Sequence, residues 1–521
     1  MAAFQTETMS GIPFILAQTQ NNTIDIGAQV SALLDFVLTP IGFVAAVLGT
    51  GTVAVLLVSR VGIHLLAAFI IFLLSMMRLE SKWVDNTLIQ PLETIRAYSR
   101  PLAWALMIAL ALRVLALPRG RRTVFFIAPV ALFLFFEIYY LGMLGVFVDP
   151  ARSIFGLIGI VATMGVFVFG LPRLMDADEE RPEFLKCLAI AGILFIVANF
   201  AQLGLGYSNA VLQGRLAGIA GNPQQFAAVC VVFSIVGCYY FSTSRAGSPL
   251  KWISAVCLGV LALFVLWSGS RTGAASLVVA VVAYFRTSLG RLALVGLIGA
   301  GVLFALTSVF SESLEITDRF FRGGDTRTLV WLAALEEFAK SPIVGQIPFE
   351  DTDGLNLTES VYLRTLALLG SIGGLFLLLA ILAWVGCTIK VWRIGQRVPA
   401  LRAESDFVVS STAFLLIVSI GEGFLLGVFT LFVAFTYSVF GAAAFVLDEG
   451  NARLEWDEAS DASDGDRDDQ EWPPSDGDEN HDAWADSADS PQTADSTAAT
   501  VPAGPSNTHG RGPVLSPAPD A

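Results

Sequence analysis

The chain has 521 residues, of which 55% are hydrophobic and only 15% are charged. Soluble globular domains carry about 25% charged residues, so this composition excludes that class and indicates a protein that crosses a membrane several times. The formal net charge of −14 arises in residues 448–521, which contain 19 acidic and 3 basic side chains, while the rest of the chain carries +2. The acidity belongs to a tail, and it indicates neither a cationic substrate nor a nucleic-acid partner.

Taken in chain order, a polar segment over residues 1–39 comes first, and it lacks the basic and apolar regions of a cleaved signal peptide. Apolar runs long enough to cross about 30 Å of hydrocarbon then recur along the chain. They lie near residues 40–59, 61–78, 101–118, 123–148, 153–172, 185–204, 225–241, 252–268, 272–286, 291–309, 361–389, 407–422 and 424–447. We therefore predict an all-α polytopic membrane protein with about 12 transmembrane helices, within a range of roughly 10 to 14.

The apolar runs form two predicted regions, an N-terminal transmembrane bundle over residues 40–204 and a transmembrane core over residues 205–447. The core contains a long segment, residues 310–358, that we expect to be a large loop outside the membrane. Residues 448–521 are rich in Asp, Ser, Pro and Ala, and they have too little apolar surface to offset the entropy cost of ordering. This tail is predicted to be disordered. The five cysteines lie in apolar runs and are interpreted as core residues.

Basic residues near the ends of the runs predict the orientation, because they concentrate in cytoplasmic loops. The basic clusters are Arg119 to Arg122, Arg173 to Lys186, Arg245 with Lys251, Arg286 with Arg291, and Lys390 to Arg402. This assignment predicts a protein of the cytoplasmic membrane with a cytoplasmic tail, and it places residues 205–223, the 268–272 turn and residues 310–358 together outside. Segment 79–100 conflicts with it, and is either an interfacial amphipathic stretch or a sign that the first spans are miscounted.

Each of the three outer segments carries arginine. Arg215 lies before Gly-Asn-Pro at residues 221–223, Arg271 ends the turn Ser268-Gly269-Ser270-Arg271, and Arg327 lies in the long segment. A charge at membrane depth is costly, so such an arginine usually pairs, reaches water or faces a cavity that handles an anion. A guanidinium group suits phosphate especially well.

Residues 200–390 resemble the O-antigen ligase and O-antigen polymerase family. The matching features are Arg-Leu-x-Gly at 215–218 with Gly-Asn-Pro at 221–223, Ser-Arg-x-Gly at 270–273, Arg327 with Trp331, Ser-Pro-Ile-Val-Gly at 341–345, Glu-Ser-Val-Tyr-Leu at 359–363 and Gly-Ser-Ile-Gly-Gly at 370–374. The resemblance implies a C-class membrane glycosyltransferase that takes a glycan from a polyprenyl diphosphate at the extracytoplasmic face. The acceptor would be a glycan, a lipid or a protein.

No metal and no cofactor is predicted, because the sequence contains neither a Gly-rich phosphate cradle nor a carboxylate cluster that would hold Mg²⁺. Positioned guanidinium groups can instead stabilise the negative charge that develops on the diphosphate leaving group. We expect Arg215 and Arg271 to bind the diphosphate, with Arg271 acting as a catalytic residue. Arg327 is expected to contribute to the same site or to stabilise the loop.

A transfer of this kind also needs a general base for the acceptor hydroxyl, and Glu359 is the predicted catalytic base. Ligases of the family carry histidine at the corresponding position, so the glutamate favours a polymerase or another transfer reaction. Asp351 and Asp353 are alternatives for the base. The predicted substrate-binding residues are Arg215, Asn222, Ser270, Arg327 and Tyr362.

These residues also have structural interpretations: Arg271 as a snorkelling side chain, Asn222 as part of a turn, Tyr362 as an interfacial anchor and Glu359 as a helix-cap partner of Thr358. Two other function classes remain open. A transporter would use the arginines to recognise an anionic solute or a lipid-linked glycan, with Glu137 relaying protons. A non-catalytic membrane scaffold would use its acidic tail to bind partners.

Overall fold

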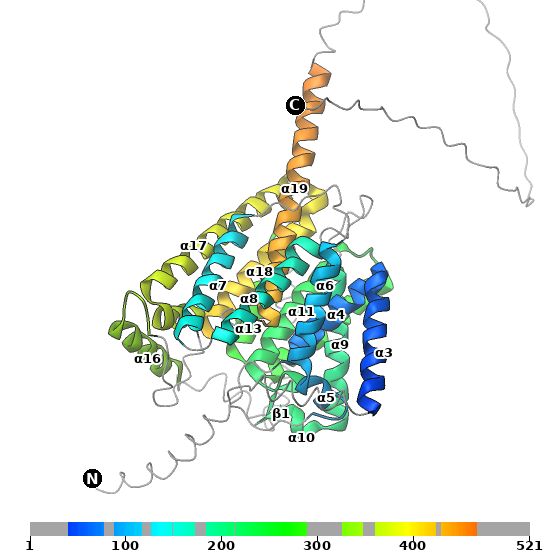
Figure 1. The fold of residues 1–521 in the computed structure, drawn as a ribbon. Helices are drawn as coiled ribbons and strands as arrows, with labels where there is room; N and C mark the ends of the chain where they lie inside the picture. The colour runs from blue at the N-terminus through cyan, green and yellow to red at the C-terminus, as the bar shows by residue number, and fades with distance from the viewer. Residues whose placement is uncertain are drawn as a thin grey trace, which may run out of the picture. The chain divides into compact units, whose positions relative to one another are not determined.

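The computed structural model describes residues 40–77, 88–116, 127–147, 150–171, 184–212, 214–288, 326–346, 360–423 and 429–465. The chain divides into one unit over residues 1–461 and a second over residues 462–521. In the described part, helices form nearly all of the first unit (Figure 1). The predicted polar segment 1–39 lies outside the described residues.

The first group of helices comprises α3 (Pro40–Val58), α4 (Arg60–Met76), α5 (Leu92–Ala97), α6 (Ser99–Leu115), α7 (Ala128–Phe147), α8 (Pro150–Met164) with its π-helical continuation η1 (Gly165–Gly170), and α9 (Phe184–Leu205). A short region of small elements follows with α10 (Tyr207–Ala210), β1 (Val211–Leu212), β2 (Arg215–Leu216) and the 3-10 turn η3 (Gly218–Ala220). The two strands pair antiparallel, with Val211 opposite Leu216 and Leu212 opposite Arg215.

The remaining elements are α11 (Pro223–Thr243), α12 (Pro249–Trp267), α13 (Arg271–Tyr284), η4 (Arg286–Ser288), α16 (Thr326–Lys340), α17 (Val361–Arg397), η7 (Pro399–Leu401), α18 (Arg402–Gly421) and α19 (Leu431–Gly465). Helices dominate because a chain inside hydrocarbon must satisfy its own backbone hydrogen bonds, and a helix does so within one segment.

Eight helical segments of the described part are long and apolar enough to cross a membrane. They are α7, α8 with η1, α9, α11, α12, α17, α18 with η7, and α19. Shorter apolar helices occur in α3, α4 and α13. The prediction of an all-α membrane protein is therefore confirmed at the level of class, and every predicted run that falls on described residues coincides with a helix. Run 291–309 lies outside them, so the predicted total of about 12 spans stays a prediction.

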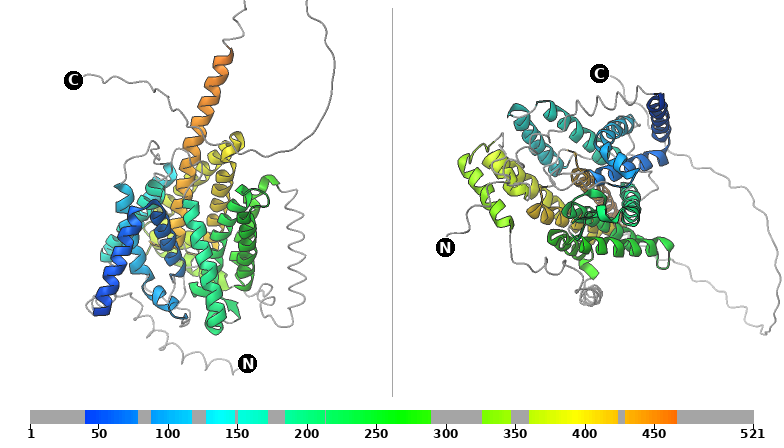
Figure 2. Two further views of the ribbon diagram at one scale, coloured as in Figure 1. Left: turned by 90° about the vertical axis from the view of Figure 1, so that its right-hand side faces the viewer. Right: turned by 90° about the horizontal axis from the view of Figure 1, so that it is seen from below.

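Helices α11 and α18 and the segment Leu431–Val446 of α19 lie inside the first unit, and the other helices surround them (Figures 1 and 2). α11 packs against α12, α13 and α18. The segment Leu431–Val446 of α19 is buried along its whole length and contains small residues such as Ala442 and Ala443. Small side chains allow helix backbones to approach closely. Close packing matters in a membrane, because lipid tails are as apolar as the helix surfaces and the hydrophobic effect does not drive the helices together.

The predicted loop 310–358 contains a helix, α16, and the ends of this loop lie outside the described residues. The predicted disordered tail begins as a helix, because α19 continues past residue 447 to Gly465. The reason is local: residues 442–460 are rich in Ala, Leu and Glu, which favour helix, and Arg453 Nε lies 2.9 Å from Glu449 Oε1 one turn away. Residues 466–521 lie outside the described part.

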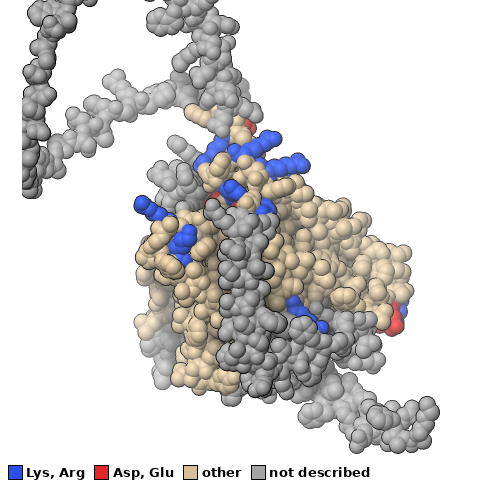
Figure 3. All heavy atoms as spheres, turned by 180° about the vertical axis from the view of Figure 1, so that it is seen from behind, with Lys and Arg blue, Asp and Glu red and all other residues tan. Residues whose placement is uncertain are grey.

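Basic side chains gather at the end of the first unit where α17 finishes and α18 begins, as Figure 3 shows from behind. Four of them, Lys390, Arg393, Arg397 and Arg402, are exposed. We call this end the basic end. α19 passes the same end, since a Cβ added to Gly450 would lie 2.2 Å from a side-chain carbon of Ile394 in α17.

Candidate functional site

At the end opposite the basic end, the β1–β2 hairpin is tied to the turn between α12 and α13. Arg215 in β2 is partly buried, and its Nε donates to the carbonyl oxygen of Ser268 at 2.7 Å. Gly269 has a φ of +60°, and a Cβ built there would lie 3.5 Å from Arg215 Nε. The structure therefore brings two of the predicted arginine motifs, which are over 50 residues apart, into direct contact.

The turn itself determines where Arg271 stands. The hydroxyl of Ser268 accepts from Ser270 N (3.2 Å), and the hydroxyl of Ser270 accepts from Gly273 N (3.1 Å), which caps the start of α13. Both serines are buried, whereas Arg271, the first residue of the helix, is exposed. Ser270 is therefore placed to position Arg271 through the cap, because its own hydroxyl lies inside the protein.

Asn222 caps a second helix beside this turn. Its Oδ1 accepts from Gln224 N (2.8 Å) and Gln225 N (3.4 Å), and Pro223 follows as the first residue of α11. A Cβ added to Gly273 in α13 would lie 2.5 Å from the Cβ of Ala227 in α11, so the first turns of the two helices pack tightly. Asn222 therefore caps a helix, where the structural interpretation had placed it in a turn, and its direct contact with substrate stays a prediction.

These contacts form an electropositive corner, which we define as Arg215, Asn222, the Ser268–Ser270 turn and Arg271. The corner contains two arginines and the N-terminal ends of α11 and α13, and each helix N-terminus carries a partial positive charge. Backbone N–H groups and aligned dipoles at such ends favour anions. The arrangement is therefore chemically suited to bind a phosphate or diphosphate.

Asn199 was not among the predicted site residues, but it supports the corner from α9. It lies fully buried in α9, where its Oδ1 accepts from Ile219 N (2.9 Å) and its Nδ2 donates to Phe195 O (2.7 Å). It thereby holds the 3-10 turn that leads into Asn222. The available signal was an amide inside an otherwise apolar run, since a buried polar residue at membrane depth needs a partner and is often functional.

The family-like Ser-Pro-Ile-Val-Gly and Gly-Ser-Ile-Gly-Gly segments pack against each other. Gly370 interrupts α17 with a φ of +61° and a ψ of −162°. At this break two backbone N–H groups of α17 donate to the turn after α16: Ser371 N to Pro342 O (2.8 Å) and Ile372 N to Ile343 O (3.2 Å). Just before the break, Ala367 O of α17 accepts from Gln346 N (3.0 Å). The turn that follows α16 therefore replaces the helical hydrogen bonds that the break removes.

Tyr362 is the second residue of α17, at the end of the helix that the break at Gly370 follows. Its hydroxyl donates to Leu416 O in α18 at 3.0 Å, and its ring lines an apolar groove of about 480 Å³ between α17 and α18. The neighbouring part of α18 runs antiparallel to α13, with Ser410 Oγ donating to Ala280 O (2.7 Å). Tyr362 thus lies at the same end of the bundle as Arg271, but in a groove of its own.

The remaining predicted residues are only partly described. Arg327 lies in the first turn of α16, and its side chain falls outside the described part, as do Glu359, Asp351 and Asp353. α17 begins at Val361 with Ser360 in the cap position, and the Ser360 side chain makes no capping hydrogen bond. Among the described residues, no cluster of His, Cys, Asp or Glu could hold a metal ion.

The fold and the corner define a class: a helical membrane protein with an electropositive site at one end of its bundle. Comparison with protein-family models and with curated proteins finds no match.

Proposed function

We propose that the protein is a membrane glycosyltransferase that transfers or polymerises a glycan from a polyprenyl-diphosphate-linked donor at the extracytoplasmic face. The observation that carries the proposal is the bond from Arg215 to Ser268, which joins the hairpin arginine to the turn that presents Arg271. The order and spacing of motifs that resemble the O-antigen ligase and polymerase family support it, as does the docking of two of those motifs at Gly370.

In this mechanism Arg215 and Arg271 bind the diphosphate of the donor. The Ser268 carbonyl fixes the plane of the Arg215 guanidinium through Nε, and the buried serine cap fixes the start of α13 beneath Arg271. As the bond between sugar and diphosphate breaks, negative charge develops on the leaving phosphate oxygens. Groups that already point at this charge stabilise the transition state without reorganising.

The acceptor hydroxyl attacks the anomeric carbon and passes its proton to a carboxylate, for which Glu359 is the proposed residue. It directly precedes Ser360, the cap residue of α17, and the N-terminal end of that helix favours the ionised carboxylate. Asp351 and Asp353 remain the alternatives. Arg327, at the start of α16, is proposed to contribute to the donor site or to stabilise the loop.

The proposed orientation places the protein in the cytoplasmic membrane as a multi-pass protein with its basic end in the cytoplasm. The acidic tail then lies in the cytoplasm, because α19 passes the basic end. The electropositive corner and the start of α17 lie at the other end, where a lipid-linked glycan and its acceptor meet.

Substitution of Arg271 tests the mechanism. We expect Arg271→Ala to slow glycan transfer by about a hundredfold or more, as loss of one charge-stabilising donor does in other enzymes. Lipid-linked glycan with a single unit should accumulate, as measured by extraction of the lipid carrier. Glu359→Gln should give the same accumulation, whereas Arg393→Ala at the basic end should leave transfer unchanged. Normal elongation by purified Arg271→Ala or Glu359→Gln protein would exclude the altered residue from catalysis.

A transporter is the second candidate, and two observations favour it. Glu137 in α7 is fully buried, and neither of its carboxylate oxygens has a hydrogen-bond partner among the described residues. α17 is also interrupted at Gly370, and transporter sites often lie where membrane helices break. Movement of lipid-linked glycan or an anionic solute across sealed vesicles, without a new glycosidic bond, would support transport over transfer.

A further inference from the structure

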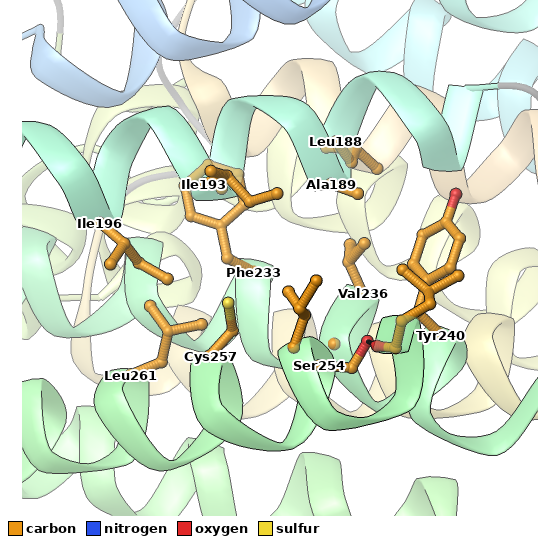
Figure 4. A pocket seen from close by; sticks show the side chains of 14 residues that line it. Leu188, Ala189, Ile193, Ile196, Phe233, Val236, Tyr240, Ser254, Cys257 and Leu261 are labelled. Carbon is orange, nitrogen blue, oxygen red and sulfur yellow. Dashed lines mark hydrogen bonds between the residues drawn. The ribbon is translucent and has the colours of Figure 1, made fainter. Parts of the chain in front are cut away.

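A narrow apolar slot lies between α9, α11 and α12, away from the electropositive corner (Figure 4). Its volume is about 80 Å³, and its walls run from Leu188 to Ile196, from Phe233 to Tyr240 and from Leu250 to Leu261. At 1.5 Å per residue these walls extend about 10 to 16 Å along the helices, so the slot is long for its volume. The Ser254 hydroxyl in its wall donates to Leu250 O (2.8 Å) of its own helix. The slot thus presents mainly hydrocarbon.

Only one end of the slot is charged. Lys186 lies two residues before Leu188 in α9, Arg245 lies in the α11–α12 connection five residues after Tyr240, and Lys251 directly follows Leu250 in the first turn of α12. The ammonium group of Lys251 lies 4.9 Å from the centre of the Phe241 ring. No charged residue follows Ile196 in α9 or Leu261 in α12. These three cations belong to the same face of the bundle as the basic end, because they lie opposite the α12–α13 turn.

The helix surface beside the slot faces outward, since the large apolar side chains Ile193, Ile253 and Val256 are 47%, 50% and 64% exposed. A neighbouring helix is about 10 to 12 Å wide and cannot enter so narrow a space, whereas a single hydrocarbon chain can. A soluble anion could bind the three cations at the charged end of the slot, but it would make no use of the apolar walls. The required occupant combines a hydrocarbon chain with an anionic head.

We propose that this slot binds an anionic phospholipid, with one acyl chain between α9, α11 and α12 and its phosphate beside Lys186, Arg245 and Lys251. The headgroup then lies in the membrane leaflet at the basic end. This binding site is separate from the proposed glycosyltransferase site, and it stands whether or not that function is correct. It gives the protein a preference for membranes that contain anionic lipid.

The test is a lipid titration of the full-length protein in detergent, followed by native mass spectrometry and thermal unfolding. The probes are phosphatidylglycerol, phosphatidylcholine with the same acyl chains, and glycerol 3-phosphate. We expect saturable binding and thermal stabilisation with phosphatidylglycerol, and neither with glycerol 3-phosphate. The double variant Arg245→Gln/Lys251→Gln should weaken phosphatidylglycerol binding roughly 25-fold, about fivefold for each basic group removed.

Filling the slot tests its apolar part. Ala189→Phe places a ring inside the slot and should abolish saturable binding, while Val256→Phe adds bulk on the exposed side of α12 and should not. Arg393→Gln/Arg397→Gln removes two cations elsewhere at the basic end and should leave binding unchanged. Equal binding of phosphatidylcholine, or full binding by the Arg245/Lys251 variant, would overturn the proposal. A change of oligomeric state in Ala189→Phe with phosphatidylglycerol binding intact would assign the slot to a second copy of the chain instead.

Discussion

Among single residues, Gly218 is the most tightly constrained position in the 3-10 turn that leads into the electropositive corner. It adopts a φ of +50°, and a Cβ added to it would lie 2.1 Å from Asn199 Oδ1 and 2.6 Å from the Phe226 ring. The same Asn199 oxygen accepts from Ile219 N, so any movement that relieves the clash also breaks this buried hydrogen bond. The position therefore tolerates glycine alone, for reasons of both conformation and space.

Gly218→Ala is expected to destabilise the protein by more than backbone strain alone, which costs roughly 1 to 3 kcal/mol at such a conformation. Gly247→Ala is the matched control, because Gly247 has a φ of +80° but nothing lies within 4 Å of an added Cβ. Thermal unfolding in detergent measures both variants. Equal losses in the two would mean that the contact with Asn199 contributes nothing beyond strain.

Among the elements, α17 depends on a turn that lies outside it. Gly345 and Gly370 approach each other through their backbones: a Cβ on Gly370 would lie 2.3 Å from Ile343 O, and a Cβ on Gly345 would lie 2.2 Å from Leu368 O. Both have positive φ. Backbone atoms cannot rotate away as side chains do, so neither glycine can be replaced without separating the turn from the helix.

Gly370→Ala or Gly345→Ala should therefore undock the turn and lower the unfolding temperature, and the double variant should lose little more than either single one, since both break the same contact. Gly386→Ala, in an open part of α17, should instead be neutral or stabilising by about 0.5 to 1 kcal/mol. Additive losses in the double variant would contradict the shared contact. Limited proteolysis between α16 and α17 gives a second measurement.

Near the basic end, a largely buried ion pair joins η4 to α18. Arg286 Nη2 lies 2.8 Å from Asp406 Oδ1, with side-chain exposures of 19% and 10%. Removal of one partner leaves a charge in apolar surroundings, so Asp406→Ala should destabilise the protein by about 3 to 5 kcal/mol. The double variant Arg286→Met/Asp406→Leu should recover part of this loss. Unfolding in denaturant measures the stability of the single and the double variant. A double variant less stable than Asp406→Ala would show that the ion pair contributes net stability.

On the scale of the whole molecule, the proposed orientation assigns opposite sides of the membrane to two exposed positions. Ala246, between α11 and α12, belongs to the cytoplasmic side, and Gln346, after α16, to the outer side. The five native cysteines are buried or half-buried, which favours a low background. A membrane-impermeant maleimide added to intact cells should label Gln346→Cys and not Ala246→Cys. The reverse pattern would invert the orientation and remove the corner from the extracytoplasmic face.

The sequence by itself determined the all-α membrane class, because apolar runs of this length have one stable form in hydrocarbon. It also selected Arg215 and Arg271, since a charged residue beside long apolar runs can be recognised in the sequence without a structure. Tertiary structure alone decided that Arg215 bonds to Ser268 in the turn before Arg271, that Asn199 holds the 3-10 turn before Asn222 and that Gly345 docks on Gly370. Such contacts join residues far apart in the chain, and they depend on helix packing and backbone conformation that local composition does not encode.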